Sequence, residues 1–227
     1  MATDDTAFRT RLVLVMPARS GPSECAVLEQ ALAGGDIASV ILYGSGENDD
    51  AARTESAAAV CAIAQPKDVA VLVSDDSRIA GRSGADGVHI EGGIEAVGDA
   101  IDRLSAKGLI VGAGMMLDRH TAMRAGEAGA DYVFFGRLDR EETEEAHPKT
   151  VALAEWWASL FEPPVIALAG STPQSAEALA RLGVDFVAVR SAVLAADDPA
   201  AAVADLNHRF ERAAQERAAL LSGSAKA

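Results

Sequence analysis

Short apolar runs alternate with longer segments of helical periodicity along the whole chain. Eight runs are almost continuously apolar, which is typical of parallel strands buried on both faces: residues 11–16, 37–43, 69–73, 87–90, 109–112, 132–135, 165–169 and 186–190. The spacing between them predicts helices over residues 23–33, 49–64, 95–107, 118–128, 150–160 and 173–182, a short one within 76–83 and a long final one over 199–221. This alternation predicts an α/β fold, a single (β/α)8 TIM barrel of parallel strands spanning residues 1–227, with an ordered core at about 10–221 and short flexible ends.

A glycine-containing junction recurs where a helix gives way to a strand, at residues 33–36, 84–87, 129–132 and 183–186. Glycine can take the left-handed conformation that ends a helix. A junction repeated in this way indicates a repeated αβ unit, as in a barrel. The alternative is a doubly wound open sheet, which usually carries G-x-G-x-x-G after its first strand. Residues 17–21 are Pro-Ala-Arg-Ser-Gly, which does not match.

Charge and composition narrow the classes of partner. Hydrophobic residues make up 49% of the chain and the formal net charge is −14. Such an acidic surface repels nucleic acid and anionic membranes, so we expect neither as a partner. A small anionic ligand stays compatible, because loop dipoles act at short range. No apolar run is long enough to span a membrane and the first ten residues are too polar for a signal peptide, so we expect a cytoplasmic protein.

The clearest chemical signal follows the seventh and eighth strands. In barrels of this kind the site lies at the carboxyl ends of the strands, and the last two loops frequently hold a phosphate. Gly170 and Ser171 precede a Thr-Pro helix start, where backbone N–H groups can approach an anion. Arg190 and Ser191 follow the eighth strand and offer a guanidinium, a hydroxyl and a backbone N–H. We therefore predict these four residues as phosphate ligands; the alternative is that both loops are only tight turns and caps.

Three further residues are candidates for catalysis. Asp75 ends the third strand, where a carboxylate could hold Mg²⁺, although a solvated turn is an equal alternative. Glu91, after the fourth strand, is a possible base or ligand, and His89 within that strand is most simply a barrel-lining residue that could also act as a base. The acidic run at residues 139–145, after the sixth strand, is expected to be a solvated, mobile loop.

These segments resemble the thiamine-phosphate synthase family and its relative, the thiazole tautomerase family. The similarity rests on Gly-Ala-Asp-Gly-Val-His-Ile at 84–90, Leu-Ile-Val-Gly at 109–112, Gly-Ala-Asp-Tyr-Val at 129–133 with Gly136, Ile-Ala-Leu-Ala-Gly-Ser-Thr-Pro at 166–173 and Val-Ala-Val-Arg-Ser-Ala-Val at 187–193. The resemblance implies a barrel that forms a homodimer and binds a thiazole phosphate at Gly170, Ser171, Arg190 and Ser191. It also implies a transferase that couples this phosphate to an aminopyrimidine diphosphate with the help of Mg²⁺, with pyrophosphate as the leaving group.

The chain departs from the family mainly where the diphosphate would bind. The family's Gln-x-Arg-x-Lys motif after the second strand is absent from residues 40–44, and of its metal ligands only Asp75 is matched. A family serine is replaced by Gly114, the tautomerase histidine falls near Met116, and the basic loop after the sixth strand is acidic, with only Lys149 close enough to compensate. Each charge-assisted contact contributes on the order of 1.5–3 kcal/mol, so the diphosphate half of the site is predicted to be weakened and the monophosphate half kept.

Three functions follow from this comparison. The first is a thiamine-phosphate-synthase-like barrel that binds a thiazole phosphate or thiamine phosphate, with the coupling reaction weakened. The second is a non-catalytic or regulatory barrel that binds the same class of ligand. The third is an enzyme that acts on another small phosphorylated metabolite, with Asp75, His89 or Glu91 as its base.

Overall fold

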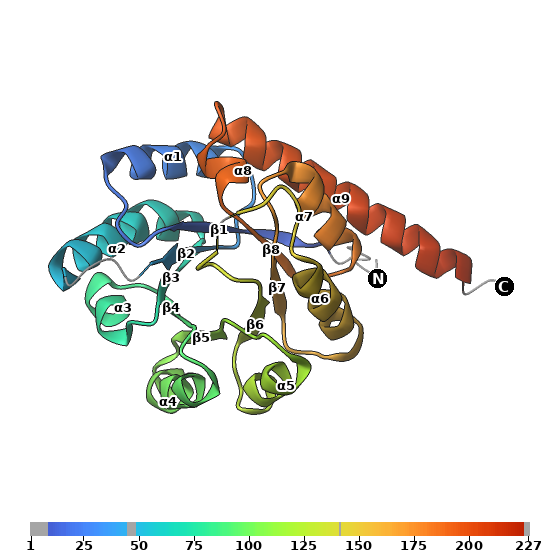
Figure 1. The fold of residues 1–227 in the computed structure, drawn as a ribbon. Helices are drawn as coiled ribbons and strands as arrows, with labels where there is room; N and C mark the ends of the chain where they lie inside the picture. The colour runs from blue at the N-terminus through green and yellow to red at the C-terminus, as the bar shows by residue number, and fades with distance from the viewer. Residues whose placement is uncertain (1–8, 45–48, 141, 225–227) are drawn as a thin grey trace, which may run out of the picture.

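The computed structural model describes residues 9–44, 49–140 and 142–224 and forms a closed barrel of eight parallel strands in the order β1 to β8 (Figure 1). The strands are β1 (Arg11–Pro17), β2 (Ser39–Tyr43), β3 (Ala70–Ser74), β4 (Gly87–Ile90), β5 (Ile110–Ala113), β6 (Tyr132–Phe135), β7 (Val165–Leu168) and β8 (Phe186–Val189). Helices surround this ring, and β1 closes it by pairing with both β2 and β8. The predicted TIM barrel is confirmed, with strand ends that differ from the expected ones by no more than two residues.

The helices follow the predicted segments closely. They are α1 (Pro22–Ala33), α2 (Asp50–Ala64), α3 (Ser77–Ser83), α4 (Ile94–Leu104), α5 (Arg119–Glu127), α6 (Pro148–Leu160), α7 (Pro173–Arg181), α8 (Ser191–Leu194) and α9 (Pro199–Ser224), with single 3₁₀ turns at Gln65–Lys67 and Ser105–Lys107. One expected end is wrong, because α9 continues past residue 221 and the Ser222 hydroxyl donates to the Ala218 carbonyl one turn back. Residues 1–8 and 225–227, where flexible ends were expected, lie outside the described residues.

Two apolar clusters hold the barrel together. One lies between the strands and the surrounding helices. The other fills the interior of the barrel and includes Val13, Ile41, Leu72, Phe134 and Ile166. Barrel interiors of this kind are packed cores built from layers of inward-pointing side chains, so the site must lie above this core, at the carboxyl ends of the strands.

The glycine junctions have a second role that the sequence did not reveal. Gly84, Gly129 and Gly183 take positive φ values of 76°, 91° and 86°. Each is followed two residues later by an aspartate that accepts the backbone N–H of the neighbouring strand. The contacts run from Val71 to Asp86 at 2.7 Å, from Val111 to Asp131 at 2.7 Å and from Val165 to Asp185 at 2.8 Å. The repeated Gly-x-Asp element therefore ties adjacent strands together at the amino-terminal end of the barrel, opposite the candidate site.

The long helix α9 packs beside α1 and α7 on one side of the barrel (Figure 1). Glu177 of α7 is 5% exposed and accepts hydrogen bonds from three arginines, Arg181 at 2.9 Å, Arg209 at 2.7 Å and Arg212 at 2.7 Å. Burial acts to raise the pKa of Glu177, but the arginine hydrogen bonds and charges outweigh it, and the pKa is lowered. This carboxylate therefore remains ionised and fastens α9 to α7. No helix in the described part of the chain is both long and apolar enough to cross a bilayer.

Candidate functional site

Three of the four predicted phosphate ligands line pockets at the carboxyl ends of β7 and β8, whereas Ser171 lines neither of these two pockets. Gly170 and Arg190 line one pocket, and Arg190 and Ser191 line a shallower one beside it. Thr172 caps α7 by accepting the Ser175 N–H at 3.2 Å, as its position before Pro173 suggested. The barrel thus brings the two loops into contact, although they are separated by α7 in the chain.

The loop between β6 and α6 lies directly on these residues. The N–H of Ser171 donates to the Thr143 carbonyl at 2.8 Å, and the N–H of Gly170 donates to the Ser175 hydroxyl at 2.9 Å. A Cβ atom at Gly170 would lie 2.3 Å from the Glu144 carbonyl oxygen, so only glycine allows this close approach. In this state the backbone donors of the β7 loop are used within the protein, and the glycine serves the packing of the β6–α6 loop.

Arg190 is held by the same loop. Its guanidinium donates to the carbonyl oxygens of Leu138 and Arg140, each at 3.2 Å. Its Nε atom lies 3.9 Å from Oε2 of Glu142, which also accepts the Ser191 N–H at 3.4 Å. The Glu142 side chain is only 15% exposed, so the expectation of a fully solvated loop at residues 139–145 is wrong for this residue.

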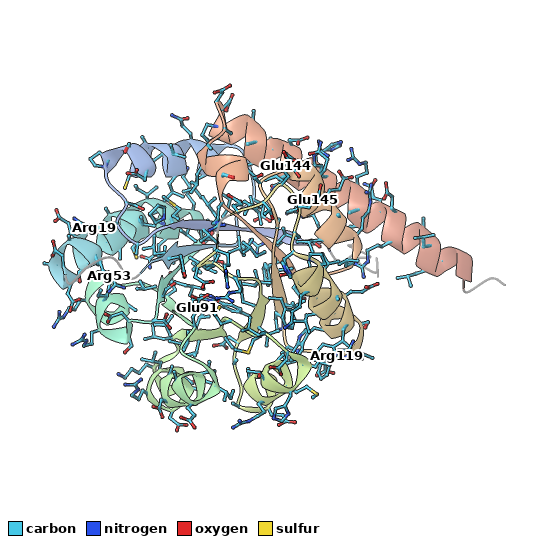
Figure 2. All side chains as sticks on the ribbon, in the orientation of Figure 1. Arg19, Arg53, Glu91, Arg119, Glu144 and Glu145 are labelled. Atoms are coloured by element: carbon cyan, nitrogen blue, oxygen red, sulfur yellow. The ribbon has the colours of Figure 1, made fainter. Side chains whose placement is uncertain are left out.

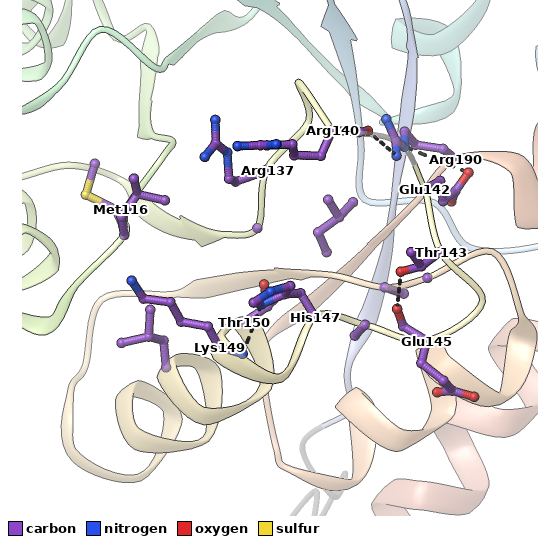
Figure 3. A pocket seen from close by; sticks show the side chains of 17 residues that line it. Met116, Arg137, Arg140, Glu142, Thr143, Glu145, His147, Lys149, Thr150 and Arg190 are labelled. Atoms are coloured by element: carbon purple, nitrogen blue, oxygen red, sulfur yellow. Dashed lines mark hydrogen bonds and ion pairs between the residues drawn. The ribbon is translucent and has the colours of Figure 1, made fainter.

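The pocket beside these loops has a volume of about 540 Å³ and is lined by two kinds of side chain. Figure 3 shows Arg190, Arg140 and Glu142 at one end and Met116 and Lys149 at the other. Its polar lining includes four cationic side chains, and its apolar wall comes from β7, α6 and the loop after β5. The lining cations are Arg137, Arg140, Lys149 and Arg190, and the main apolar residues are Met116, Leu117, Leu153 and Leu168. Such a pocket can receive an anion joined to an apolar ring.

Two of these cations, Lys149 and Arg137, had a small part or no part in the site predicted from the sequence. Lys149, noted as a compensating charge, lines the pocket and has no carboxylate partner within 4.0 Å among the described residues. Arg137 was missed; it comes two residues after β6 and is paired with Asp139, which accepts its Nε–H at 2.9 Å. Its position just after a strand was the available signal. His147, the last residue of the loop before α6, caps this helix, because its Nδ1 atom accepts the Lys149 N–H at 3.1 Å.

The candidate catalytic residues lie apart from this pocket, around the ends of β3 and β4. His89 is fully buried in the barrel, and its Nδ1 atom lies 2.8 Å from the Tyr132 hydroxyl. Its Nε2 atom lies 3.8 Å from Oε1 of Glu91, and neither atom has a hydrogen-bond partner within the described structure. Asp75, at a positive φ of 54°, accepts the Glu91 N–H at 2.7 Å. Figure 2 shows Glu91 inside the ring of strands, with Glu144 and Glu145 farther out beside α7.

This part of the barrel mouth is acidic. Burial is the main cause that raises the pKa of Tyr43, at the end of β2, to about 12, and the negative charges of Glu91, Asp139 and Asp75 add to the effect. The Tyr43 hydroxyl therefore stays protonated. The residues at the end of β2, where the family would place its diphosphate-binding cations, supply no positive charge within Ser39–Tyr43.

The predicted Mg²⁺ ligand does not belong to a preformed metal centre. One oxygen of Asp75 is used by the Glu91 N–H, and Asp76 caps α3 and lies 3.6 Å from the Arg53 guanidinium. Within the described ranges, no three His, Cys, Asp or Glu side chains are grouped so that they could hold a metal ion. Mg²⁺ is usually held by one or two carboxylates, with waters and substrate phosphates completing the octahedron, so Asp75 could supply one ligand but does not make a metal centre by itself.

Comparison with known proteins gives a consistent result. The family model of thiamine monophosphate synthase matches residues 12–193. The thiamine-phosphate synthase of Hyphomonas neptunium is 40% identical over 210 residues, covering 89% of this chain and 95% of that protein. The thiamine-phosphate synthase of Rhodospirillum centenum is 39% identical over 202 residues, covering 87% and 96%.

Solved structures agree on the fold. Thiamine phosphate pyrophosphorylase from Pyrococcus furiosus superposes with a TM-score of 0.72 at 22% identity, covering 92% of this chain and 99% of that chain. The 3-hexulose-6-phosphate synthase of Salmonella typhimurium gives 0.71 at 17% identity, covering 90% and 100%. At such identities structural likeness establishes the barrel alone, whereas the family model and the sequence relatives go further. They show that the chain belongs to the thiamine-phosphate synthase family, a family of thiamine biosynthesis.

Proposed function

We propose that this chain binds a thiazole phosphate or thiamine phosphate in the pocket between the β6, β7 and β8 loops, and that its diphosphate-dependent coupling activity is weak or lost. The observation that carries the proposal is the lining of the pocket, where Lys149 and Arg190 face a space with an apolar wall. A ligand with one phosphate and one ring needs both features.

The phosphate would lie at the Arg190 end. At this end the Ser191 N–H becomes available when the Glu142 carboxylate turns away, whereas the N–H groups of Gly170 and Ser171 are held by the Ser175 hydroxyl and the Thr143 carbonyl. Lys149, at the other end of the pocket, adds a positive charge that has no carboxylate partner among the described residues. The ring would lie against Met116 and Leu153, because burial of an apolar ring favours that wall.

The proposed loss of coupling rests on charge. A diphosphate would have to bind beside Asp75, Glu91 and Tyr43, where Tyr43 already has its pKa raised by nearby negative charge. Two unit charges at 4 Å interact by about 4 kcal/mol at an effective dielectric constant of 20, so uncompensated acids strongly disfavour a diphosphate. At the Arg190 end of the pocket, by contrast, two arginines, Arg140 and Arg190, lie beside one carboxylate, Glu142.

Calorimetry with thiazole phosphate and thiamine phosphate tests the binding half. We expect wild type to bind at least one of them, and Arg140→Met, at the Arg190 end of the pocket, to weaken that binding about tenfold or more, since a charge-assisted contact contributes roughly 1.5–3 kcal/mol. Arg82→Met is the matched control, because Arg82 is an exposed residue in the last turn of α3 and does not line this pocket. Absence of wild-type binding, or equal loss in both variants, would count against the pocket.

A turnover assay tests the catalytic half. Purified protein is supplied with thiazole phosphate, aminopyrimidine diphosphate and Mg²⁺, and thiamine phosphate is measured beside a sequence relative as positive control. We expect little or no product. Formation at a rate similar to that of the relative would contradict the proposed loss of coupling.

A second candidate function is an enzyme that moves a proton on another small phosphorylated metabolite. The observation in its favour is the pair of buried atoms, His89 Nε2 and Glu91 Oε1, that lack hydrogen-bond partners among the described residues. Buried acid–base groups left unpaired are uncommon and are often found where a substrate is handled. If this candidate holds, Glu91→Gln abolishes turnover of the metabolite while leaving its binding intact; unchanged turnover rules Glu91 out as the base.

A further inference from the structure

We propose that the carboxylate of Glu142 is a built-in occupant of the anion site at Arg190 and Ser191, and that a phosphate group enters this site by displacing it. The inference rests on the proposed function, because it concerns the same pocket. It adds a competitor within the protein that sets how strongly the site holds phosphate. The acidic loop is thereby part of the binding site and not merely a cover over it.

The first support is the set of partners that Glu142 shares with the predicted phosphate. Its Oε2 atom accepts the Ser191 N–H at 3.4 Å and lies 3.9 Å from Arg190 Nε. These are two of the donors that the sequence assigns to a phosphate oxygen. A carboxylate and a phosphate are both oxyanions, so they compete for the same donors.

The second support is that the pairing is incomplete. Glu142 Oε1 and Arg190 Nε are both buried and have no hydrogen-bond partner in the described part of the chain. Leaving buried charged atoms without hydrogen bonds is unfavourable. A phosphate offers three terminal oxygens in tetrahedral directions, against two coplanar ones in a carboxylate, and so can reach both Arg190 Nε and the Ser191 N–H. The present occupant is therefore poorly matched and can be displaced.

The third support is that the exchange does not require the described loop around Glu142 to leave. The backbone next to Glu142 is fastened by the Ser171 N–H, which donates to the Thr143 carbonyl at 2.8 Å, and by the Thr172 hydroxyl, which donates to the Glu144 carbonyl at 3.0 Å. In both contacts the loop contributes a main-chain carbonyl oxygen as the acceptor, and the Glu142 side chain takes no part. Rotation of the Glu142 side chain can thus open the site while Thr143 and Glu144 stay in place.

The test is calorimetric titration of inorganic phosphate into the full chain in three forms. They are wild type, Glu142→Gln and Glu144→Gln. Glu144→Gln is the matched control, since it removes the same charge from the same loop, and the Glu144 side chain is exposed with no contact to Arg190 among the described residues. Glu142→Ala provides a second variant that removes the competing oxygens altogether, and thermal unfolding without ligand verifies that each variant is folded.

We expect Glu142→Gln and Glu142→Ala to bind inorganic phosphate about tenfold or more tightly than wild type, and Glu144→Gln to change the affinity less than about twofold. Equal affinity in all forms would overturn the inference and leave the proposed pocket standing. Weaker binding by the Glu142 variants would show that the carboxylate supports the site and would also overturn the inference. If no form binds inorganic phosphate, both the inference and the proposed location of the phosphate fail together.

Discussion

The backbone N–H of Ser171 donates a 2.8 Å hydrogen bond to the carbonyl oxygen of Thr143. This contact joins the loop after β7, which carries Gly170 and Ser171, to the acidic loop after β6. Because the two loops are hydrogen-bonded to each other, we expect a substitution in one to affect the other. We also expect ligand binding to depend on how the two loops share their donors and acceptors.

Gly170 offers a direct test of this packing. An alanine Cβ would lie 2.3 Å from the Glu144 carbonyl oxygen, so we expect Gly170→Ala to lower the free energy of unfolding by about 1–3 kcal/mol, as overpacking typically does. Urea denaturation measures the change. Gly98→Ala in α4 is the control, because no atom of the described residues lies within 4 Å of its Cβ position and alanine should stabilise a helix there by about 0.5–1 kcal/mol. Similar effects at both positions would show that the loop does not press on Gly170.

We expect the effects of substitutions at Gly114 and Glu91 on the free energy of unfolding to be coupled. A Cβ at Gly114 would lie 2.8 Å from Glu91 Cγ and 2.6 Å from His89 Nε2, so Gly114→Ala should destabilise the barrel by about 1–3 kcal/mol. Glu91→Ala removes the Cγ atom and should recover part of this cost. A double-mutant cycle by chemical denaturation measures the coupling, which we expect to be about 0.5–2 kcal/mol. Strict additivity would mean that Glu91 does not occupy the space that Gly114 leaves open.

The ionised carboxylate of Glu177 should make the free energy of unfolding depend on pH in the acid range. Its pKa is lowered by the arginine hydrogen bonds despite its burial, so the stability it contributes is fully present above its ordinary pKa of 4.5 and is lost as the pH falls through the lowered folded-state pKa. Glu177→Gln should cost about 1–3 kcal/mol at pH 7 and make the loss of stability below pH 4.5 less steep. Urea denaturation across the pH range measures both. Glu216→Gln, a half-exposed partner of Arg181, should change stability by less than about 1 kcal/mol, and an equal effect there would argue against a special role for Glu177.

The hydroxyl of Tyr132 has a structural role toward His89. Tyr132→Phe leaves Nδ1 of a fully buried histidine without its 2.8 Å partner, and we expect a loss of about 1–3 kcal/mol in the free energy of unfolding. Thermal unfolding of Tyr43→Phe is the comparison, since Tyr43 is only partly buried and should show a smaller loss. A negligible effect in Tyr132→Phe would mean that the histidine is satisfied in another way.

The sequence predicted the barrel well because its signals are local. Continuous apolar runs, the glycine junctions at Gly84, Gly129 and Gly183 and the Thr172-Pro173 helix start each act over a few residues, and each is found where it was expected. The junction at residues 33–36 differs, because Gly34 ends α1 with a φ of −82° and not in the left-handed conformation. The contact between Glu142 and Arg190 spans 48 positions in the chain and depends on how one loop folds over another, which no local pattern encodes. For the same reason, the acidic run was expected to be solvated, although Glu142 is largely buried. Arg137 was missed because its position in the lining of the pocket becomes visible only when the loop after β6 and α6 are placed side by side.

A crystal structure of the protein with thiamine phosphate bound would show directly whether the phosphate of such a ligand lies between the loops after β6, β7 and β8. We expect the phosphate beside Arg190 and the Ser191 N–H, the Glu142 carboxylate turned away, and the ring against Met116 and Leu153. A phosphate bound beside Asp75 at the end of β3, with Glu142 still in contact with Ser191, would show that the proposed location is wrong.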